Sequence, residues 1–197
     1  MKRKWRLDPS RFFGLMLLGL IGFDGIPKAS AYSNKLDFTF GGFSINATNS
    51  STNKTAKVSG LGAYEVRYRR AITRHVDFLA GYSLHFQKVF TGDSIYGLDF
   101  GVIYFPFSAS GAVTSRSEDV EIVVSETWRP FVMVDFLQRN FQGIQTTYTG
   151  FGGGAGTEWR WTDTLSVIGQ VRGASLSAGQ GTSAAEISVS AGLVIGF

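Results

Sequence analysis

Apolar and polar residues alternate with a period of two in eight separate stretches of this chain. Such alternation is typical of β-strands that have one apolar and one polar face. In the clearest stretch, Tyr82 and Leu84 share the apolar face, whereas Ser83 and His85 share the polar face. Turn-like polar segments separate the predicted strands, which span residues 36–45, 61–70, 76–86, 95–105, 130–137, 149–161, 165–176 and 186–197.

The length and the polar faces of these strands indicate a membrane protein. Most are about 10–12 residues long, close to the ~9–11 residues with which a tilted strand crosses a bilayer, whereas strands of soluble proteins usually have only ~5–6 residues. Their polar faces combine glycine and serine with glutamate and arginine, which suits a narrow polar lumen better than the apolar core of a soluble sandwich. We therefore predict an all-β fold, an eight-stranded antiparallel up-and-down transmembrane β-barrel.

Aromatic residues at the strand ends give this barrel an orientation. With an even number of strands both termini lie on the periplasmic side, and aromatic residues form a girdle at each membrane surface. The predicted inner girdle comprises Tyr68, Tyr104, Phe105, Trp128, Trp159, Trp161 and Phe197. The predicted outer girdle comprises Tyr96, Phe141, Tyr148 and Phe151.

The connections follow the same orientation, since outer loops are long and inner turns are short. We expect outer loops at residues 46–58, 87–94, 138–148 and 177–185, and inner turns at residues 71–75 and 162–164. Residues 106–128 form an unusually long inner connection. We interpret residues 120–124 within it as an extension of the fifth strand into the periplasm.

Glycines mark two irregular places in the predicted wall. After Phe40, the pair Gly41-Gly42 shifts the apolar positions to Phe43 and Ile45, which predicts a bulge in the first strand. The sixth strand contains a run of glycines at Gly150, Gly152, Gly153, Gly154 and Gly156. A dinucleotide site needs a helix after such a run, and none is predicted, so we interpret it as close strand packing or a bend.

The first 31 residues have the layout of a secretory signal peptide. A basic segment at residues 2–6 precedes an apolar run at residues 12–23, and Ala29-Ser30-Ala31 offers a cleavage site. The apolar run is shorter than the ~20 residues that a spanning helix needs. We therefore expect residues 1–31 to be removed and residues 32–197 to form one barrel domain.

Charge and cysteine content narrow the classes of function. The chain has a net charge of +4, and residues 1–31, with six basic and two acidic side chains, account for all of it. A neutral barrel domain lacks the basic footprint of a nucleic-acid partner. The chain has no cysteine, which excludes disulfides and cysteine-ligated metals. We expect no nucleic acid, no cofactor and no metal.

The end of the chain carries the most specific pattern. Phe197 is the last residue, and apolar residues occupy alternate positions back to Ile187. This resembles the C-terminal signature of outer-membrane barrels, and residues 32–197 resemble the small eight-stranded family of outer-membrane protein A transmembrane domains, X/Ail-type barrels and opacity-like proteins. The resemblance implies a place in the bacterial outer membrane, with its lipids and lipopolysaccharide as partners. It also implies insertion by the barrel assembly machinery, with an assembly signal formed by Phe197, Ile195 and Leu193.

The predicted lumen carries many charges. They are Glu65, Arg67, Arg69, Asp77, Asp99, Asp135, Glu158, Arg160, Arg172 and Glu186. An eight-stranded barrel is only wide enough for its own side chains, and buried charges are costly unless they pair. We therefore predict a lumen ion-pair network that plugs the barrel, with a gated ion path as the alternative.

Ser83 and His85, with Asp77 on the same face, supply the groups of a hydrolase. Some eight-stranded barrels are lipid A deacylases with a His/Ser pair. The order Ser-Leu-His differs from their His-x-Ser order, and the alternation directs both side chains into the lumen, away from lipid. We therefore assign no catalytic residue.

These observations favour a non-enzymatic outer-membrane protein with a structural or surface-interaction role. Envelope integrity, adhesion or host contact through an extracellular ligand of the four outer loops would each fit this class. The alternatives are a lipid A-modifying, deacylase-like enzyme and a narrow ion channel.

Overall fold

The computed structural model describes residues 34–49, 54–88, 91–110, 113–117, 120–124, 126–143, 145–179 and 181–197. The predicted signal peptide, residues 1–31, lies outside them. Eight long strands are β1 (Asn34–Asn49), β2 (Lys54–Ala71), β3 (Val76–Lys88), β4 (Thr91–Tyr104), β7 (Trp128–Phe141), β8 (Thr146–Arg160), β9 (Leu165–Ala178) and β10 (Thr182–Gly196). In the described part of the chain, no helix is long and apolar enough to cross a membrane.

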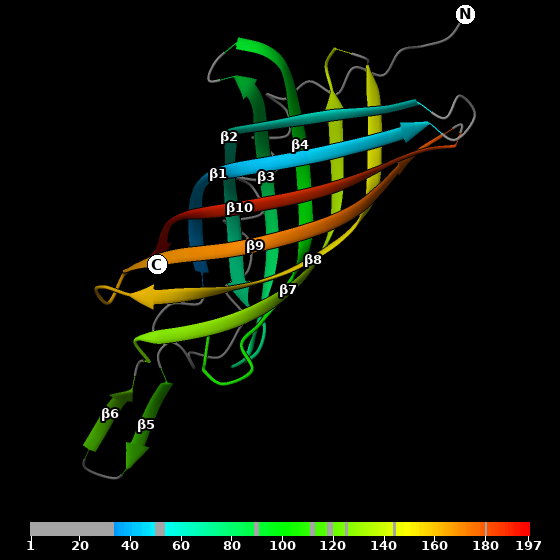
Figure 1. Cartoon of the computed structure of the whole chain (residues 1–197). Helices are drawn as coiled ribbons and strands as arrows, with labels where there is room; N and C mark the ends of the chain where they lie inside the picture. The colour runs from blue at the N-terminus through cyan, green and yellow to red at the C-terminus, as the bar shows by residue number, and fades with distance from the viewer. Residues whose placement is uncertain are drawn as a thin grey trace, which may run out of the picture.

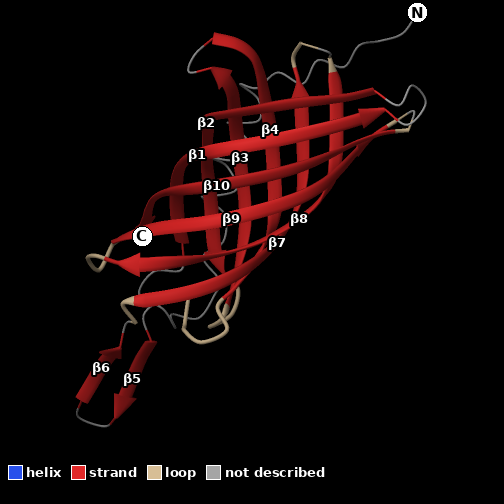
Figure 2. Ribbon diagram, viewed as in Figure 1, coloured by secondary structure: helices blue, strands red, loops and turns tan. Residues whose placement is uncertain are grey.

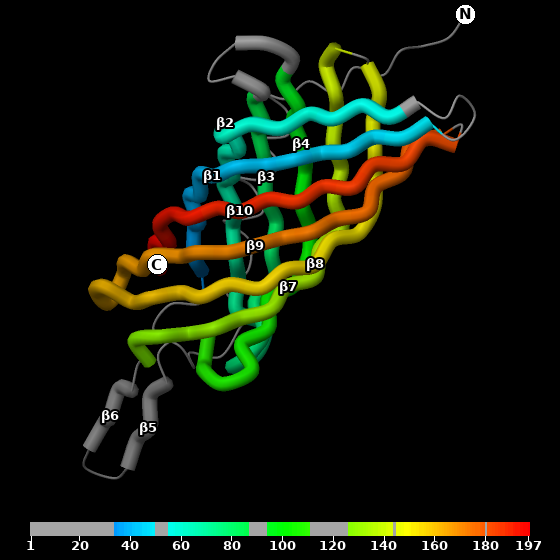
Figure 3. Tube along the Cα trace, viewed as in Figure 1, coloured from blue at the N-terminus to red at the C-terminus, as the bar shows by residue number. Residues whose placement is uncertain are grey.

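The eight long strands form a closed antiparallel barrel in the order β1-β10-β9-β8-β7-β4-β3-β2. β1 and β10 close it, in register from Lys35↔Gly196 to Asn49↔Thr182, and Figure 1 shows these two strands side by side. Every described element in Figure 2 is a strand, a turn or a loop, and the tube in Figure 3 follows the same continuous wall. The predicted fold class is confirmed.

The alternation of side chains also follows the prediction through most of the wall. On β3, Ser83 and His85 are fully buried inside the barrel, whereas Tyr82 and Leu84 lie on its outer surface. On β10, Ile187, Val189, Leu193 and Ile195 are exposed on the outside, as is Phe197 directly after the strand, whereas Val194 points inward.

Residues 106–128 differ from the prediction. Residues 120–124 do not extend the fifth strand, because β6 (Val120–Val124) pairs instead with β5 (Val113–Ser117) in a separate hairpin. β7 begins only at Trp128. Pairing between β5 and β6 gives hydrogen-bond partners to backbone N–H and C=O groups. A single strand that extended β7 into the periplasm would leave these groups without partners in the sheet. Figure 1 shows this hairpin projecting from the inner end of the barrel, the end at which the C-terminus lies.

The predicted bulge is present, but on the neighbouring strand. Between Gly41 and Phe43 of β1 the register with β2 shifts by one residue, and β2 holds the extra residue, near Leu61. β1 itself keeps its alternation and its unbroken register with β10. Phe43 and Ile45 therefore point into the barrel, where they are 5% and 1% exposed, and the prediction of a parity shift in the first strand is wrong.

The segment after β4 folds back over the inner end of the lumen. Ser108, Ala109 and Ser110 are buried, and the Ser110 amide donates to Arg74 O at 2.8 Å. Phe105 belongs to this segment and is fully buried inside, with its ring 5.9 Å from that of Phe131. Its assignment to the inner girdle is therefore wrong, because the chain turns inward there to close the barrel.

Glycines in β8 make room for larger lumen side chains. A Cβ at Gly152 would lie 2.6 Å from Asp135 Oδ1, and one at Gly156 would lie 2.5 Å from Phe131 Cζ. A Cβ at Gly156 would also lie 2.4 Å from the backbone oxygen of Gly169, so that position requires glycine, whereas a side chain at Gly152 would displace the Asp135 carboxylate. The run therefore allows close packing inside a narrow barrel.

Candidate functional site

An inner ion cluster fills the lumen near its periplasmic end. It consists of Lys35, Asp37, Arg69, Asp77, Arg129 and Glu158, all buried. Arg69 Nε donates to Asp37 Oδ1 at 2.8 Å and Arg69 Nη2 donates to Glu158 Oε2 at 3.1 Å. Lys35 Nζ donates to Asp77 Oδ2 at 3.0 Å. These side chains come from five strands, so the cluster ties distant parts of the wall together across the lumen.

An outer ion cluster lies further along the lumen and consists of Glu65, Asp99, Asp135, Arg139, Arg172 and Glu186. Arg172 is its centre and contacts the carboxylates of Glu65, Asp99, Asp135 and Glu186. The shortest of these contacts joins Arg172 Nη2 to Glu65 Oε1 at 2.7 Å. Arg139 Nε donates to Glu186 Oε2 at 2.8 Å. Each arginine thus neutralises carboxylates from several other strands.

Arg67 connects the two clusters. Its Nη2 lies 3.4 Å from Asp37 Oδ2 of the inner cluster, and its Nη1 lies 3.7 Å from Glu65 Oε2 of the outer cluster. Arg67 Nη2 also donates to Gln170 Oε1 at 2.7 Å. These contacts link the two ion clusters through Arg67, and all of the side chains involved are buried.

Two apolar clusters complete the filling of the lumen. The inner apolar cluster contains Leu79, Ile103, Phe105, Phe131, Met133, Ile168 and Val194. The outer apolar cluster contains Phe43, Ile45, Ala63, Ile95, Leu137, Tyr148, Leu176 and Ala184. Along β9, Ile168, Arg172 and Leu176 belong in turn to the inner apolar, outer ion and outer apolar clusters. The lumen is therefore packed in successive layers.

The structure places nearly all of the predicted lumen charges inside the barrel. Except for Arg160, they all lie in the two ion clusters or, as Arg67 does, between them. Arg160 is only partly buried, at the inner mouth, and its Nη2 donates to Asp163 O at 3.0 Å.

The prediction also missed members of the ion clusters, namely Lys35, Asp37, Arg129 and Arg139. Asp37 alternates with Leu36 and Phe38, so its parity could have revealed it. Arg129 and Arg139 lie just outside the predicted fifth strand, residues 130–137, because β7 is longer at both ends.

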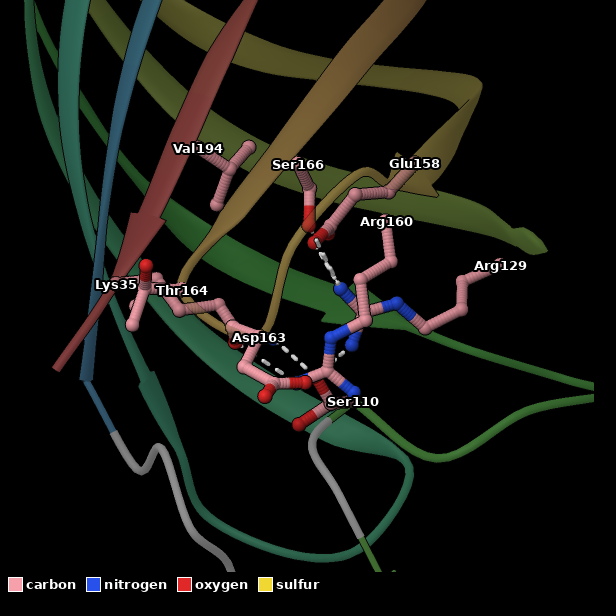
Figure 4. Close-up of a pocket in the computed structure, with 10 residues that line it drawn as sticks. Lys35, Ser110, Arg129, Glu158, Arg160, Asp163, Thr164, Ser166 and Val194 are labelled. Atoms are coloured by element: carbon pink, nitrogen blue, oxygen red, sulfur yellow. Dashed lines mark hydrogen bonds and ion pairs between the residues drawn. The ribbon is translucent and has the colours of Figure 1, made fainter. Parts of the chain in front are cut away.

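The inner mouth is closed by backbone as well as by side chains. Ser110 O accepts hydrogen bonds from Lys35 Nζ and from Arg129 Nη1, and Arg129 Nη2 also donates to Glu158 Oε1. Figure 4 shows these residues together at the inner mouth. On the other side, His75 Nδ1 donates to Ser108 O at 2.8 Å. The segment is thus held from two sides.

Ser83 and His85 do not form an accessible catalytic pair. Both are fully buried in the lumen, and His85 Nε2 lies 3.9 Å from Glu186 Oε1. The His85 ring packs edge-on against Phe43, with ring centroids 4.8 Å apart. Neither side chain faces the outer wall, where a lipid acyl chain would approach. Their sequence neighbours Tyr82 and Leu84 face outward instead.

The polarity of the wall reverses toward the outer end of the barrel. The outer collar consists of residues 43–49, 54–63, 137–141, 146–149, 174–178 and 182–185. Its inward side chains include all of the outer apolar cluster except Ile95. Its outward side chains are mostly polar, among them Asn46, Lys57, Ser59, Thr147, Thr149, Ser175, Ser177 and Ser183. Tyr148, assigned to the outer girdle, is 2% exposed and belongs to the collar core.

Below the collar is the embedded wall, in which the outward side chains are apolar. Along β10 and the residue after it, the embedded wall runs from Ile187 to Phe197, close to the ~9–11 residues of a strand that crosses the hydrocarbon region. Exposed Trp128, Trp159 and Trp161 lie at its inner end, as an interfacial girdle requires. An apolar belt with a polar collar indicates that the outer ends of the strands project beyond the bilayer.

Comparison with known proteins supports this assignment through structure rather than sequence. No family model matches the chain, and no curated protein matches it. The crystal structure of Neisserial surface protein A is similar with a TM-score of 0.55 and 12% identity, over 84% of this chain and 97% of that chain.

Two further solved structures are similar at lower TM-scores. The N-terminal β-barrel domain of Pseudomonas aeruginosa OprF has a TM-score of 0.46 and 15% identity, over 84% of this chain and 98% of that chain. The attachment invasion locus protein of Yersinia pestis has a TM-score of 0.38 and 10% identity, over 83% and 99%.

The closed barrel, its apolar belt and the likeness to Neisserial surface protein A define the class of protein. The chain has the fold of the small eight-stranded outer-membrane barrels and is a protein of the bacterial outer membrane.

Proposed function

We propose that this protein is a closed, non-enzymatic barrel that acts at the outer surface of the membrane. Its role is structural or interactive: envelope integrity, adhesion or host contact through the collar and the outer loops. The observation that carries this proposal is the layered filling of the lumen by two ion clusters and two apolar clusters. With its interior occupied, the accessible chemistry of the barrel lies on its outer end.

A complementation experiment tests this role. Cells that lack the protein are supplied with the wild type or with a variant whose loop residues 50–53 and 89–90 are replaced by glycine and serine. We expect both proteins to restore detergent resistance and only the wild type to restore adherence to host cells. Loss of detergent resistance alone would favour a purely structural role, and full activity of the variant in both assays would contradict a role for these loops.

A channel would require ions to pass Arg172, which binds carboxylates of four other residues. Moving these groups apart would leave buried charges without partners, which costs several kcal/mol. We expect purified protein in planar lipid bilayers to show no conductance steps, with a general porin as positive control. Sustained single-channel openings of the wild type would contradict the closed-barrel proposal.

An enzyme would require Ser83 and His85 to reach lipid, and both are buried in the lumen. We expect lipopolysaccharide incubated with the barrel to keep its acyl chains, as measured by mass spectrometry of lipid A. Loss of a chain with the wild type but not with Ser83→Ala would support the deacylase-like alternative instead.

We further propose that Phe197, Ile195 and Leu193 form the assembly signal read by the barrel assembly machinery. All three point outward on the closing strand, and the Phe197 amide donates to Asn34 O at 2.9 Å. Deleting Phe197 should lower the amount of heat-modifiable, membrane-inserted protein in cells. Gly179→Ala, at an open position beyond the end of β9, is the matched control, and normal insertion after the deletion would contradict the proposal.

A further inference from the structure

The outer end of β2 has a strand neighbour on only one side. β2 pairs with β1 from Lys54 to Arg70, but it pairs with β3 only from Gly62 to Ala71. Among the described strands, therefore, nothing pairs with residues 54–61 on the side away from β1. Figure 1 shows this half of β2 running at a steep angle to β3.

Other seams of the barrel leave much shorter free edges at their outer ends. β4 begins at Thr91 and pairs with β7 from Ile95. β8 begins at Thr146 and pairs with β9 from Thr149. The long free edge of β2 is therefore a local feature and not a general consequence of strand stagger.

The bulge explains why β2 leaves β3. The extra residue of β2 lies near Leu61, next to the register shift between Gly41 and Phe43 of β1. A bulge bends its strand and increases the local twist. Beyond the bulge, β2 stays with β1 in the collar and turns away from β3, so the free edge is built into the fold.

This edge is accessible and retains the hydrogen-bonding capacity of a strand. Thr55, Lys57 and Ser59 are exposed, and Leu61 is 75% exposed. Residues 54–61 contain no proline, which is one of the devices that block strand addition. The lysines and the bulge discourage unselective strand addition. An extended peptide that adds to the N–H and C=O groups of this edge therefore has to complement its charge.

We propose that residues 54–61 of β2 form a docking site for an extended acidic segment of another protein, which adds to the sheet as a strand. The charge near the free edge of β2 favours this partner. Residues 42–61, which include the outer ends of β1 and β2, contain Lys54 and Lys57 and no aspartate or glutamate. A basic edge disfavours basic strands and a second copy of itself, whereas opposite charges across a strand pair are favourable. The inference rests on the proposed surface-interaction function and names its partner class.

A peptide-binding experiment tests the charge preference. The barrel in phosphatidylcholine nanodiscs is titrated with fluorescent peptides of alternating valine and glutamate or alternating valine and lysine, eight residues in length. We expect the glutamate peptide to bind at least about tenfold more tightly, equivalent to about 1.4 kcal/mol. In Lys57→Glu, an exposed position, the edge has one positive and one negative charge, so the preference for the glutamate peptide should be lost. Equal binding of both peptides, no binding, or an unchanged preference in Lys57→Glu would overturn the proposal.

A proline series tests whether binding uses the strand edge. Proline is introduced singly at Thr55, Ala56, Lys57 and Val58. Because N–H groups along a strand point alternately to either side, one alternating pair should lose at least about tenfold in affinity, equivalent to about 1.4 kcal/mol, while heat-modifiable folding is retained. Proline at the other two positions removes hydrogen bonds to β1 instead, so peptide binding to the free edge should change less. Folded variants that all bind like the wild type would overturn the edge as the site.

Two further readings separate this proposal from its rivals. Ser59→Cys in a chain without native cysteine reports self-association: disulfide-linked dimers in nanodiscs without peptide would show that a second copy occupies the edge. Host-cell adherence of Lys57→Glu separates the two proposals. If the wild type supports adherence but binds no peptide, the docking site at the edge of β2 is overturned and the proposed surface role still stands. Peptide binding by a wild type that shows no adherence would leave the edge standing and overturn that role.

Discussion

On β10, Ser183 and Val189 both point outward, yet they belong to regions of opposite polarity. Val189 lies in the embedded wall, where outward residues are apolar and the neighbouring inward residues, Ser188 and Ser190, are polar. Ser183 lies in the collar, where the neighbouring inward residue, Ala184, belongs to an apolar core. One continuous sheet thus carries the pattern of a membrane barrel at one end and of a soluble barrel at the other.

The difference shows how surroundings determine which residues a β-sheet buries. Hydrocarbon accepts apolar side chains on the outside of the embedded wall, so its narrow lumen can also hold polar groups, which must pair with one another. Beyond the bilayer, water takes the place of hydrocarbon, and the hydrophobic effect again drives apolar side chains inward. The collar therefore obtains its stability from packing, and the embedded wall from lipid contact, ion pairing and the packing of the inner apolar cluster.

The largest expected effect comes from removing the centre of the outer ion cluster. Arg172→Ala leaves carboxylates such as those of Glu65 and Asp99 buried without their partner. Breaking a buried ion pair in this way costs about 3–5 kcal/mol, and urea unfolding in lipid vesicles should show that loss of stability. Val171→Ala, one residue away and outward-facing, is the control. Losses of equal size would show that the cluster adds little to stability.

A smaller effect should locate the boundary between the two regions. Val189→Arg puts a charge against hydrocarbon near the middle of β10, which costs about 2–4 kcal/mol, whereas the cost falls to about 0–1 kcal/mol near the interface. Ser183→Arg in the collar should therefore remain close to the wild type. The unfolding free energies of both variants are compared in the same lipid. Equal destabilisation would mean that Ser183 also faces hydrocarbon.

The smallest effect compares the same substitution on the two sides of the sheet. Ile45→Val shortens a side chain in the collar core, where Ile45 is 1% exposed, and should cost about 0.5–1.5 kcal/mol. Ile187→Val acts on a residue of the embedded wall that faces outward, and should stay within about 0.5 kcal/mol of the wild type. A larger loss at Ile187 than at Ile45 would contradict the assigned polarity of the collar.

Much of the embedded wall could be predicted from alternation alone. In the strand that contains Tyr82 and Ser83, each residue has one of only two possible environments, so parity assigns both side chains correctly. The same rule failed at Phe43 and Ile45, because it assumed that apolar residues always face lipid. The collar reverses that relation, and nothing local to those residues marks where the bilayer ends.

The alternation and the length of the strands by themselves determined the fold class, the strand number and the polar face of each embedded strand. The tertiary structure decided which charges pair, since Arg172 meets Glu65 and Asp99 only after distant strands close into a ring. It also decided that β2 carries the bulge and leaves β3, and that residues 105–110 cover the inner mouth. Strand identity follows from local periodicity, whereas partners across a lumen and free edges depend on register and closure, which are properties of the whole sheet.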